Sequence, residues 1–328
     1  MLRYIVKRIL ITIPVLLGVT FIIFAMMFFT PGDPAQLMLG DFATQEEVIA
    51  LRAEMGLDDP FFTQYFRYLK GLFRGDLGTS FTNGLPVLTE IQNRLPVTIK
   101  LSVFCMIFAM LIGIPFGILS AVRQYSFLDN IAMVLALLGI SMPNFWLALI
   151  LILFFSVSLG LLPASGLYGA LYYIMPVISI SAVSIATITR MTRSSMLEVI
   201  RQDYIRTARA KGKSETSIIF KHALKNALIP IITVIGIQFA SALSGAVVNE
   251  QIFAIPGLGK LMVDAIKARN YPIIRGGVLV IAFMFSFLNL FIDLLYAFVD
   301  PRIRSLYARR REHKTSLTET EKEAPNNA

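Results

Sequence analysis

The chain has 328 residues, of which 56% are hydrophobic and 16% are charged, with a formal net charge of +9. Soluble domains are about 45–50% apolar and about 25% charged, so this composition fits a chain whose solvent is largely lipid. The basic residues lie beside long apolar blocks, which argues against nucleic-acid binding and for orientation in a membrane.

Six apolar blocks are long enough to cross a bilayer, whose core of about 30 Å needs roughly 20 helical residues. They cover residues 9–30, 97–122, 130–160, 171–189, 227–249 and 278–299. The first lacks a small-residue cleavage site and is too long for a signal peptide, so we expect a retained span. The third is longer than one span needs, and Pro143 should kink it. The sequence therefore predicts an all-α membrane protein with six transmembrane helices.

Residues 31–96, between the first two spans, are predicted to form a partly helical segment outside the membrane. Thr44 and Glu47 have the spacing of a capping box, and the helix that they open should end near Gly56. A second helix follows with an apolar face, which should lie on the membrane surface or pack on the bundle. That face consists of Phe61, Phe62, Tyr65, Phe66, Leu69, Leu72 and Phe73.

Lys and Arg gather beside some helix ends and not others, and this distribution predicts the orientation in the membrane. Basic residues flank the first span, fill the 190–226 loop and follow residue 301, whereas residues 161–171 carry no charge. Both termini and the 190–226 loop are therefore predicted to be cytoplasmic, in the inner or plasma membrane. The polar tail, residues 306–328, is predicted to be disordered.

No catalytic or metal site is recognisable in the sequence. The histidines His222 and His313 are far apart, and there is no Cys/His cluster. Residues 210–214 end like a phosphate-binding Walker A loop, but Thr207 stands where that loop needs a glycine. We therefore expect no ATP hydrolysis, no metal and no cofactor in this chain.

The loop between the fourth and fifth spans is basic and partly helical. Gly212 should end one helix, and Ser214 should cap a short second helix over residues 213–224. The apolar residues of this second helix should be shielded from water, either by a docking partner or by the neighbouring spans or the lipid headgroups. The residues alone slightly favour the second explanation, because polybasic loops beside membranes commonly serve only to fix the orientation of the spans.

This loop resembles the EAA loop of binding-protein-dependent ABC permeases, in the form typical of the dipeptide, oligopeptide, glutathione and nickel group. Arg206, Thr207 and Ala208 replace the general Glu-Ala-Ala, and Leu224-Lys225 replaces Leu-Pro, as is typical of that group. Other matching segments follow in order along residues 1–305. They are Thr30–Pro34, Gly56–Asp58, Gly75–Gly78, Met142–Trp146, Phe253–Gly259, Asp293–Tyr296 and Asp300–Arg302.

The resemblance implies a type I ABC importer permease, the first permease subunit of the peptide group, with a permease core over residues 97–305. It implies a second homologous permease subunit, two ATP-binding subunits and an extracytoplasmic substrate-binding protein as partners. The coupling loop to the ATP-binding subunits would use Arg206, Thr207, Ala208, Gly212, Ser214, Ile218, Phe220, His222, Leu224 and Asn226. Peptide, glutathione, nickel and sugar systems share these motifs, so the cargo stays open. A secondary transporter or channel without an ATPase is the alternative, which intramembrane charges and paired broken helices would favour. The sequence shows one deep acid and no such pair. A purely structural assembly factor is the third option.

Two groups of residues could line the transport path or form a gate, one at the kink of the third block and one at the outer end of the fifth span. Ser141, Pro143 and Asn144 lie at the expected kink, where path lining and simple packing explain them equally well. Asn249 and Glu250 are expected at the outer mouth, either as a gate or binding-protein contact or as a capped helix end. The resemblance favours the gate weakly.

A third candidate is Asp293 in the sixth span. It shares one helix face with Asn289 and Asp300, and an ionised group there should point into the bundle. It either lines a cavity or pairs with a nearby arginine. We favour the pairing, because the residue is close to the basic interface.

Overall fold

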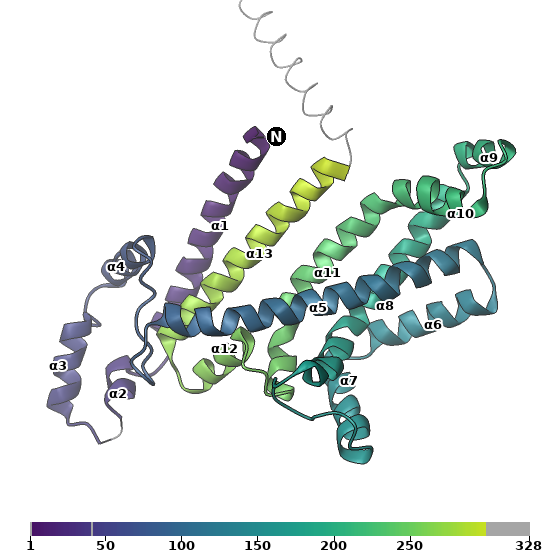
Figure 1. The fold of residues 1–328 in the computed structure, drawn as a ribbon. Helices are drawn as coiled ribbons and strands as arrows, with labels where there is room; N and C mark the ends of the chain where they lie inside the picture. The colour runs from purple at the N-terminus through teal and green to yellow at the C-terminus, as the bar shows by residue number, and fades with distance from the viewer. Residues whose placement is uncertain (1, 41, 300–328) are drawn as a thin grey trace, which may run out of the picture.

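A computed structural model describes residues 2–40 and 42–299, except the side chains of residues 2–5, 7, 244–245 and 293–299. The predicted tail, residues 306–328, lies outside that range. Five helices are long and apolar enough to cross a membrane, and a sharply bent pair can supply a sixth span. The five (Figure 1) are α1 (Leu2–Phe29), α5 (Val87–Val122), α8 (Ile174–Ile200), α11 (Leu224–Ile252) and α13 (Tyr271–Val299). The predicted all-helical membrane fold is confirmed.

Several helices extend past the apolar blocks that predicted them. Helix α5 begins at Val87 rather than residue 97, because Val87 and Ile91 pack into a core that α13 shares. Helix α8 runs to Ile200 rather than residue 189, because Met196 is buried against the end of α5 and the 203–223 segment. Tertiary contacts, rather than hydropathy, therefore set these ends.

The third apolar block is broken more sharply than the predicted kink. Helix α6 (Phe127–Ser141) and helix α7 (Asn144–Leu151), which a π-helix extends (Ile152–Ser158), meet at an angle of 103°. Met142 is extended at φ −86° and ψ 129°, the conformation that a following proline favours. Pro143 therefore ends one helix and starts another, so the block is a bent pair and not one kinked helix.

Helices α5 and α8 approach closely through small residues. A Cβ on Gly113 would lie 2.9 Å from Ile188 Cγ2, and a Cβ on Gly117 would lie 2.5 Å from Thr192 Cβ. Both glycines lie on one face of α5, four residues apart. Without a hydrophobic driving force between helices in lipid, such close packing is a main source of association.

We expect Gly117→Leu to lower the unfolding midpoint of the detergent-solubilised protein, at a cost of about 2 kcal/mol, because its side chain overlaps Thr192. Gly18→Leu is the matched control, since a Cβ there meets nothing within 4 Å on α1. Equal midpoints for both variants, measured by thermal denaturation, would contradict this account of the α5–α8 contact.

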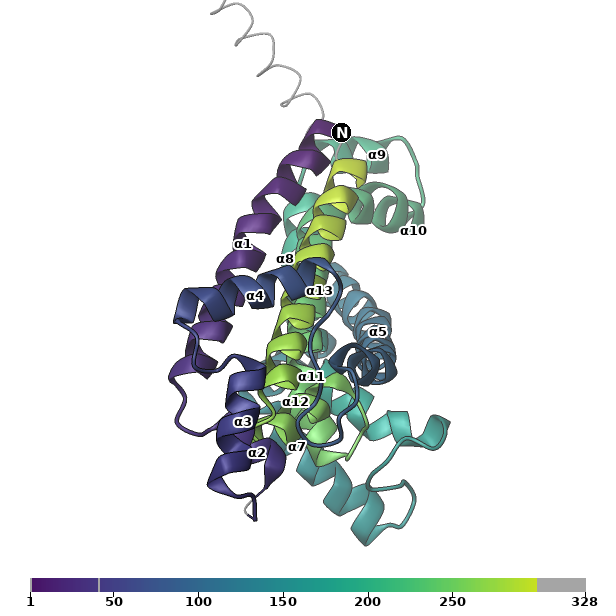
Figure 2. The same ribbon diagram turned by 90° about the vertical axis from the view of Figure 1, so that its left-hand side faces the viewer.

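The segment between α1 and α5 contains three helices, α2 (Pro34–Leu39), α3 (Gln45–Met55) and α4 (Phe61–Phe73). The predicted capping box of α3 is confirmed, since Thr44 and Glu47 exchange both hydrogen bonds. Gly56 ends α3 in the left-handed conformation, at φ 63°. Helix α4 crosses the side of α1 (Figure 2), where Phe61 and Tyr65 contact aromatic rings of α1. The rest of the predicted apolar face is only partly covered, since Phe62, Phe66 and Phe73 are exposed.

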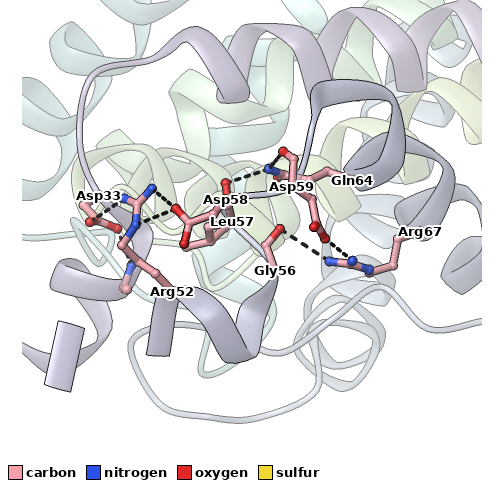
Figure 3. Close-up of polar contacts among 9 residues, drawn as sticks. Asp33, Arg52, Gly56, Leu57, Asp58, Asp59, Gln64 and Arg67 are labelled. Atoms are coloured by element: carbon pink, nitrogen blue, oxygen red, sulfur yellow. Dashed lines mark hydrogen bonds and ion pairs between the residues drawn. The ribbon is translucent and has the colours of Figure 1, made fainter. Parts of the chain in front are cut away.

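Ion pairs link α2, α3 and α4 through the residues beside them (Figure 3). Arg52 on α3 contacts Asp33, before α2, at 2.8 Å and Asp58, after α3, at 2.7 Å. Arg67 on α4 pairs with Asp59. Exposed pairs of this kind each contribute little to stability, but together they help to hold the short helices in position relative to one another.

The two ends of the bundle carry different elements. Figure 1 places the N-terminus of α1, the end of α13 and α9 (Asp203–Ala210) at one end. The opposite end carries α2, α3 and α12 (Leu258–Lys267). This arrangement agrees with an even number of membrane crossings between the N-terminus and the end of α13.

Candidate functional site

The 203–226 segment forms a compact helical turn at one end of the bundle. Helix α9 ends in a Schellman motif, in which Gly212 N–H donates to Arg209 O at 2.9 Å and Lys213 N–H to Ala208 O at 3.3 Å. Gly212 takes the left-handed conformation, at φ 76°. The predicted helix end at Gly212 is confirmed, and its physical cause is the conformation that this motif requires.

The predicted short helix over residues 213–224 does not stand apart from the fifth span. Ser214 caps α10 (Glu215–Ser217) as predicted, accepting from Ser217 N–H at 3.4 Å. A π-helical stretch (Ile218–Ala223) then leads into α11 without an intervening loop. A movement of this segment would therefore act directly on a membrane-length helix. π-Helical turns are frequent at functional sites.

The apolar residues of the segment divide into two sets. Ile218 is fully buried against Ile205, Met196 and Ile118, and Leu224 is partly buried beside the same cluster. Phe220 points away from this cluster and is 55% exposed. The chain's own helices therefore cover most of the apolar surface, as the residues alone favoured, and leave Phe220 uncovered.

Polar side chains before and after Gly212 contact one another. Arg209 contacts both carboxylate oxygens of Glu215, at 2.7 and 3.2 Å. Lys213 Nζ lies 2.9 Å from His222 Nε2, and Asn226 Nδ2 donates to the hydroxyl of Tyr204 at 3.0 Å. Sequence analysis missed Arg209, Glu215 and Tyr204 as partners, although opposite charges flanking a helix-breaking glycine were a usable signal.

The remaining residues of the predicted coupling loop lie on the surface of this turn, apart from Ala208, which is buried. Arg206, Thr207, Gly212, Ser214 and Asn226 are exposed, and His222 is partly exposed. Together with Phe220 they make one mixed apolar and basic surface, which we call the turn surface. It combines one exposed aromatic side chain, Phe220, with the exposed guanidinium of Arg206.

The residues of the bend are arranged around the break between α6 and α7. Ser141 is exposed, and its hydroxyl donates to Leu137 O at 2.8 Å, one turn back in the last turn of α6. Asn144 begins α7, and its Oδ1 is buried without a hydrogen-bond partner among the described residues. An unpartnered amide oxygen beside a broken helix is compatible with a path-lining role, which stays a prediction.

Asn249 and Glu250 are not exposed at an outer mouth. Both residues are 0% exposed, near the end of α11. Ser179 on α8 donates to Asn249 Oδ1 at 3.0 Å. Neither side chain reaches the surface of this chain, so neither is placed to contact a soluble binding protein directly. The gate role stays a prediction.

Glu250 joins three separate parts of the chain. Its Oε1 accepts from Thr98 on α5 at 2.6 Å, and its Oε2 accepts from Lys260 N–H, in the first turn of α12, at 2.9 Å. Thr98 Oγ1 in turn accepts from Leu258 N–H at 2.8 Å. The carboxylate therefore caps α12 and ties it to α5 and α11, as anions at helix N-termini do.

Asp293 lies on α13, but its side chain is outside the described residues, so neither its predicted pairing nor its predicted cavity role is tested. The nearby Asn289 donates to Phe285 O, at 3.0 Å. This bond lies within α13 and brings in no other helix.

Family models match almost the whole chain. The model described as "Binding-protein-dependent transport system inner membrane component" matches residues 113–305. The model described as "Binding-prot-dependent transport system membrane comp, N-term" matches residues 1–102.

Relatives with assigned names are similar over nearly their full lengths. The chain is 44% identical to the dipeptide transport system permease protein of Alkalihalophilus pseudofirmus, over 93% of this chain and 100% of that protein. It is 42% identical to the dipeptide transport system permease protein of Escherichia coli, over 93% and 99%. It is also 42% identical to the glutathione transport system permease protein of Salmonella paratyphi A, with the same coverage of 93% and 99%.

The fold is also similar to that of solved structures. A chain of the inward-facing MetNI methionine ABC transporter aligns with a TM-score of 0.56 and 19% identity, over 65% of this chain and 97% of that chain. Another crystal form gives a TM-score of 0.54 and 18% identity. This likeness concerns the fold alone, and it agrees with the type I permease architecture predicted from the sequence.

Proposed function

The chain belongs to the family of binding-protein-dependent transport system inner membrane components, and on that premise we propose how it works and what it carries. As a permease subunit of an ATP-driven importer, it is an integral inner-membrane transport protein and not an enzyme. Family membership favours this function over the alternative of a secondary transporter or channel. The proposed cargo is a small peptide, since named relatives serve dipeptide and glutathione transport.

The proposed partners are a second homologous permease chain, two ATP-binding subunits and a substrate-binding protein outside the membrane. In this proposal the turn surface docks on an ATP-binding subunit, with Phe220 as its apolar anchor. The observation that carries the proposal is the direct helical continuation from Glu215 into α11, which would transmit movement of the turn to the membrane. Arg209 and Glu215 would keep the turn rigid.

The proposed orientation puts both termini and the turn surface in the cytoplasm, with residues 31–96 and α12 outside. Two observations support it. Lys and Arg are concentrated at the end of the bundle that carries α9, where Arg206 and Lys211 are exposed. The capped and ion-paired helices α2 and α3 lie at the opposite end (Figure 1).

Two cysteine variants test the docking and the orientation together. The native Cys105 is buried, at 1% exposure, so labelling reports only the introduced cysteine. We expect a membrane-impermeant maleimide to label Thr44→Cys on intact cells, and Ser214→Cys only on inverted vesicles. Coexpressed ATP-binding subunits should protect Ser214→Cys from the reagent and copurify with the chain.

Labelling of Ser214→Cys on intact cells would contradict the orientation. A labelling rate that is unchanged by the ATP-binding subunits would contradict docking at the turn surface, even if the orientation holds.

A further inference from the structure

A cavity of about 510 Å³ lies at the outer end of the bundle, separate from the turn surface. The ends of α1 and α13, helices α3 and α4, residues 30–34 and the loop before α5 line it, and it is partly open to the surface. Its charged lining consists of Arg52, Arg67, Asp76 and Arg275. No described residue of α5, α8 or α11 lines it, so it lies beside the helices at the side of the bundle and not among them.

Arg275 is the cation of this cavity that has no acidic partner. Arg52 and Arg67 are already ion-paired with aspartates (Figure 3). Arg275 has no carboxylate within ion-pair distance among the described side chains, and its buried Nε has no hydrogen-bond partner. The carboxylate in the lining, that of Asp76, instead accepts from Gly78 N–H at 2.8 Å.

Aromatic rings hold the Arg275 guanidinium without neutralising it. The guanidinium carbon lies 5.6 Å from the ring centroid of Phe24 and 5.0 Å from that of Tyr68. Tyr68 and Tyr271 also line the cavity, and their hydroxyls are buried with no hydrogen-bond partner among the described residues. The guanidinium and the two hydroxyls belong to residues that line one cavity, and they are the hydrogen-bond donors that an oxyanion there would need. An uncompensated arginine in a membrane helix is costly.

The position of the cavity indicates a lipid as the source of that oxyanion. Arg275 lies about one turn inside the start of α13, near the level of the outer headgroups on the proposed orientation. Beside it, α4 exposes Phe62, Phe66 and Phe73, at 62%, 64% and 84%. Exposed apolar side chains on an amphipathic helix are typical of a helix that lies in the membrane interface, where phospholipid headgroups are the available anions.

We propose that this cavity binds the phosphate of an anionic phospholipid headgroup, with Arg275 as its principal ligand and the hydroxyls of Tyr68 and Tyr271 as further donors. Arginine suits this chemistry because its planar fork matches phosphate oxygens bidentately. The lipid would bridge α1, α4 and α13 and steady the outer segment on the bundle.

The test is native mass spectrometry of the full chain, purified in detergent with its coexpressed partner subunits. The complex is titrated with phosphatidylglycerol, with phosphatidylcholine, and with phosphatidylglycerol in the presence of inorganic phosphate. We expect the wild type to retain phosphatidylglycerol in preference to phosphatidylcholine, and Arg275→Gln to weaken its binding about fivefold or more. Arg74→Gln is the matched control, because Arg74 is exposed and does not line the cavity.

Arg275→Lys, which keeps the charge but loses the fork, should retain intermediate binding. Equal retention of the two lipids by the wild type would overturn the proposal without any variant, as would unchanged binding by a folded Arg275→Gln complex. If millimolar inorganic phosphate displaces phosphatidylglycerol completely, the proposal that a lipid supplies the phosphate is contradicted, and the cavity is a site for a soluble anion.

Discussion

Gly212→Val is expected to abolish solute uptake while the protein still inserts and assembles in the membrane. Gly212 has φ 76°, and a β-branched residue there costs about 1–3 kcal/mol of strain. A Cβ at Gly212 meets nothing within 4 Å, so the strain is conformational and not a clash. The turn should relax by leaving the Schellman motif, which would turn the surface that carries Phe220 away from an ATP-binding subunit.

Uptake of a radiolabelled dipeptide by cells that express the complete transporter measures this effect, with the amount of inserted chain determined in parallel. Gly169→Val is the matched control, because Gly169 has φ 173° and equally open surroundings. Gly212→Asn should keep much of the uptake, since asparagine tolerates the left-handed conformation. If Gly212→Val takes up the dipeptide as fast as the wild type does, this turn does not couple the ATP-binding subunits to transport.

Glu250→Ala is expected to lower the free energy of unfolding by about 3 kcal/mol or more. The change removes the acceptor for Thr98 Oγ1 and for Lys260 N–H, and each unsatisfied buried donor costs about 1–3 kcal/mol. It also leaves a void where the side chain now packs tightly on Gly257 and Gly259. Helix α12 should then separate from α5 before the rest of the bundle unfolds.

Thermal denaturation in detergent, combined with hydrogen exchange at α12, measures this loss. Glu54→Ala is the control, because Glu54 lies exposed on α3. Glu250→Gln should fall between the two, since one oxygen acceptor remains while the new amide NH₂ faces a donor. An unfolding midpoint for Glu250→Ala equal to that of Glu54→Ala would mean that the carboxylate does not hold α12 in place.

Most of the secondary structure could be predicted from the sequence because its causes are local. The capping box of Thr44 and Glu47, the helix end at Gly212 and the cap at Ser214 each depend on residues within about four positions. The membrane-length helices followed from hydropathy over windows of about 20 residues. The resemblance in the 206–226 loop predicted the family, and the family models and the named relatives confirm it.

Hydropathy could not predict where the helices end or how sharply the third block bends. Lipid solvation favours any apolar helix, so the block at residues 130–160 looked continuous. Its break follows from the extended backbone at Met142 before Pro143 and from the packing of α6 and α7 on α8. The end of α8 at Ile200 likewise depends on a cluster with the end of α5, which hydropathy does not report.

The sequence by itself determined that this chain crosses a membrane, where its helices lie approximately and which family it joins. Only the tertiary structure decided which polar groups meet: Glu250 meets Thr98, Arg193 meets Asp129 at 2.6 Å, and Arg275 meets aromatic rings but no carboxylate among the described side chains. Hydropathy and capping act between neighbours in the chain. A buried ionic group is satisfied or left unpaired by residues far away in sequence, and only the packing of helices brings these together.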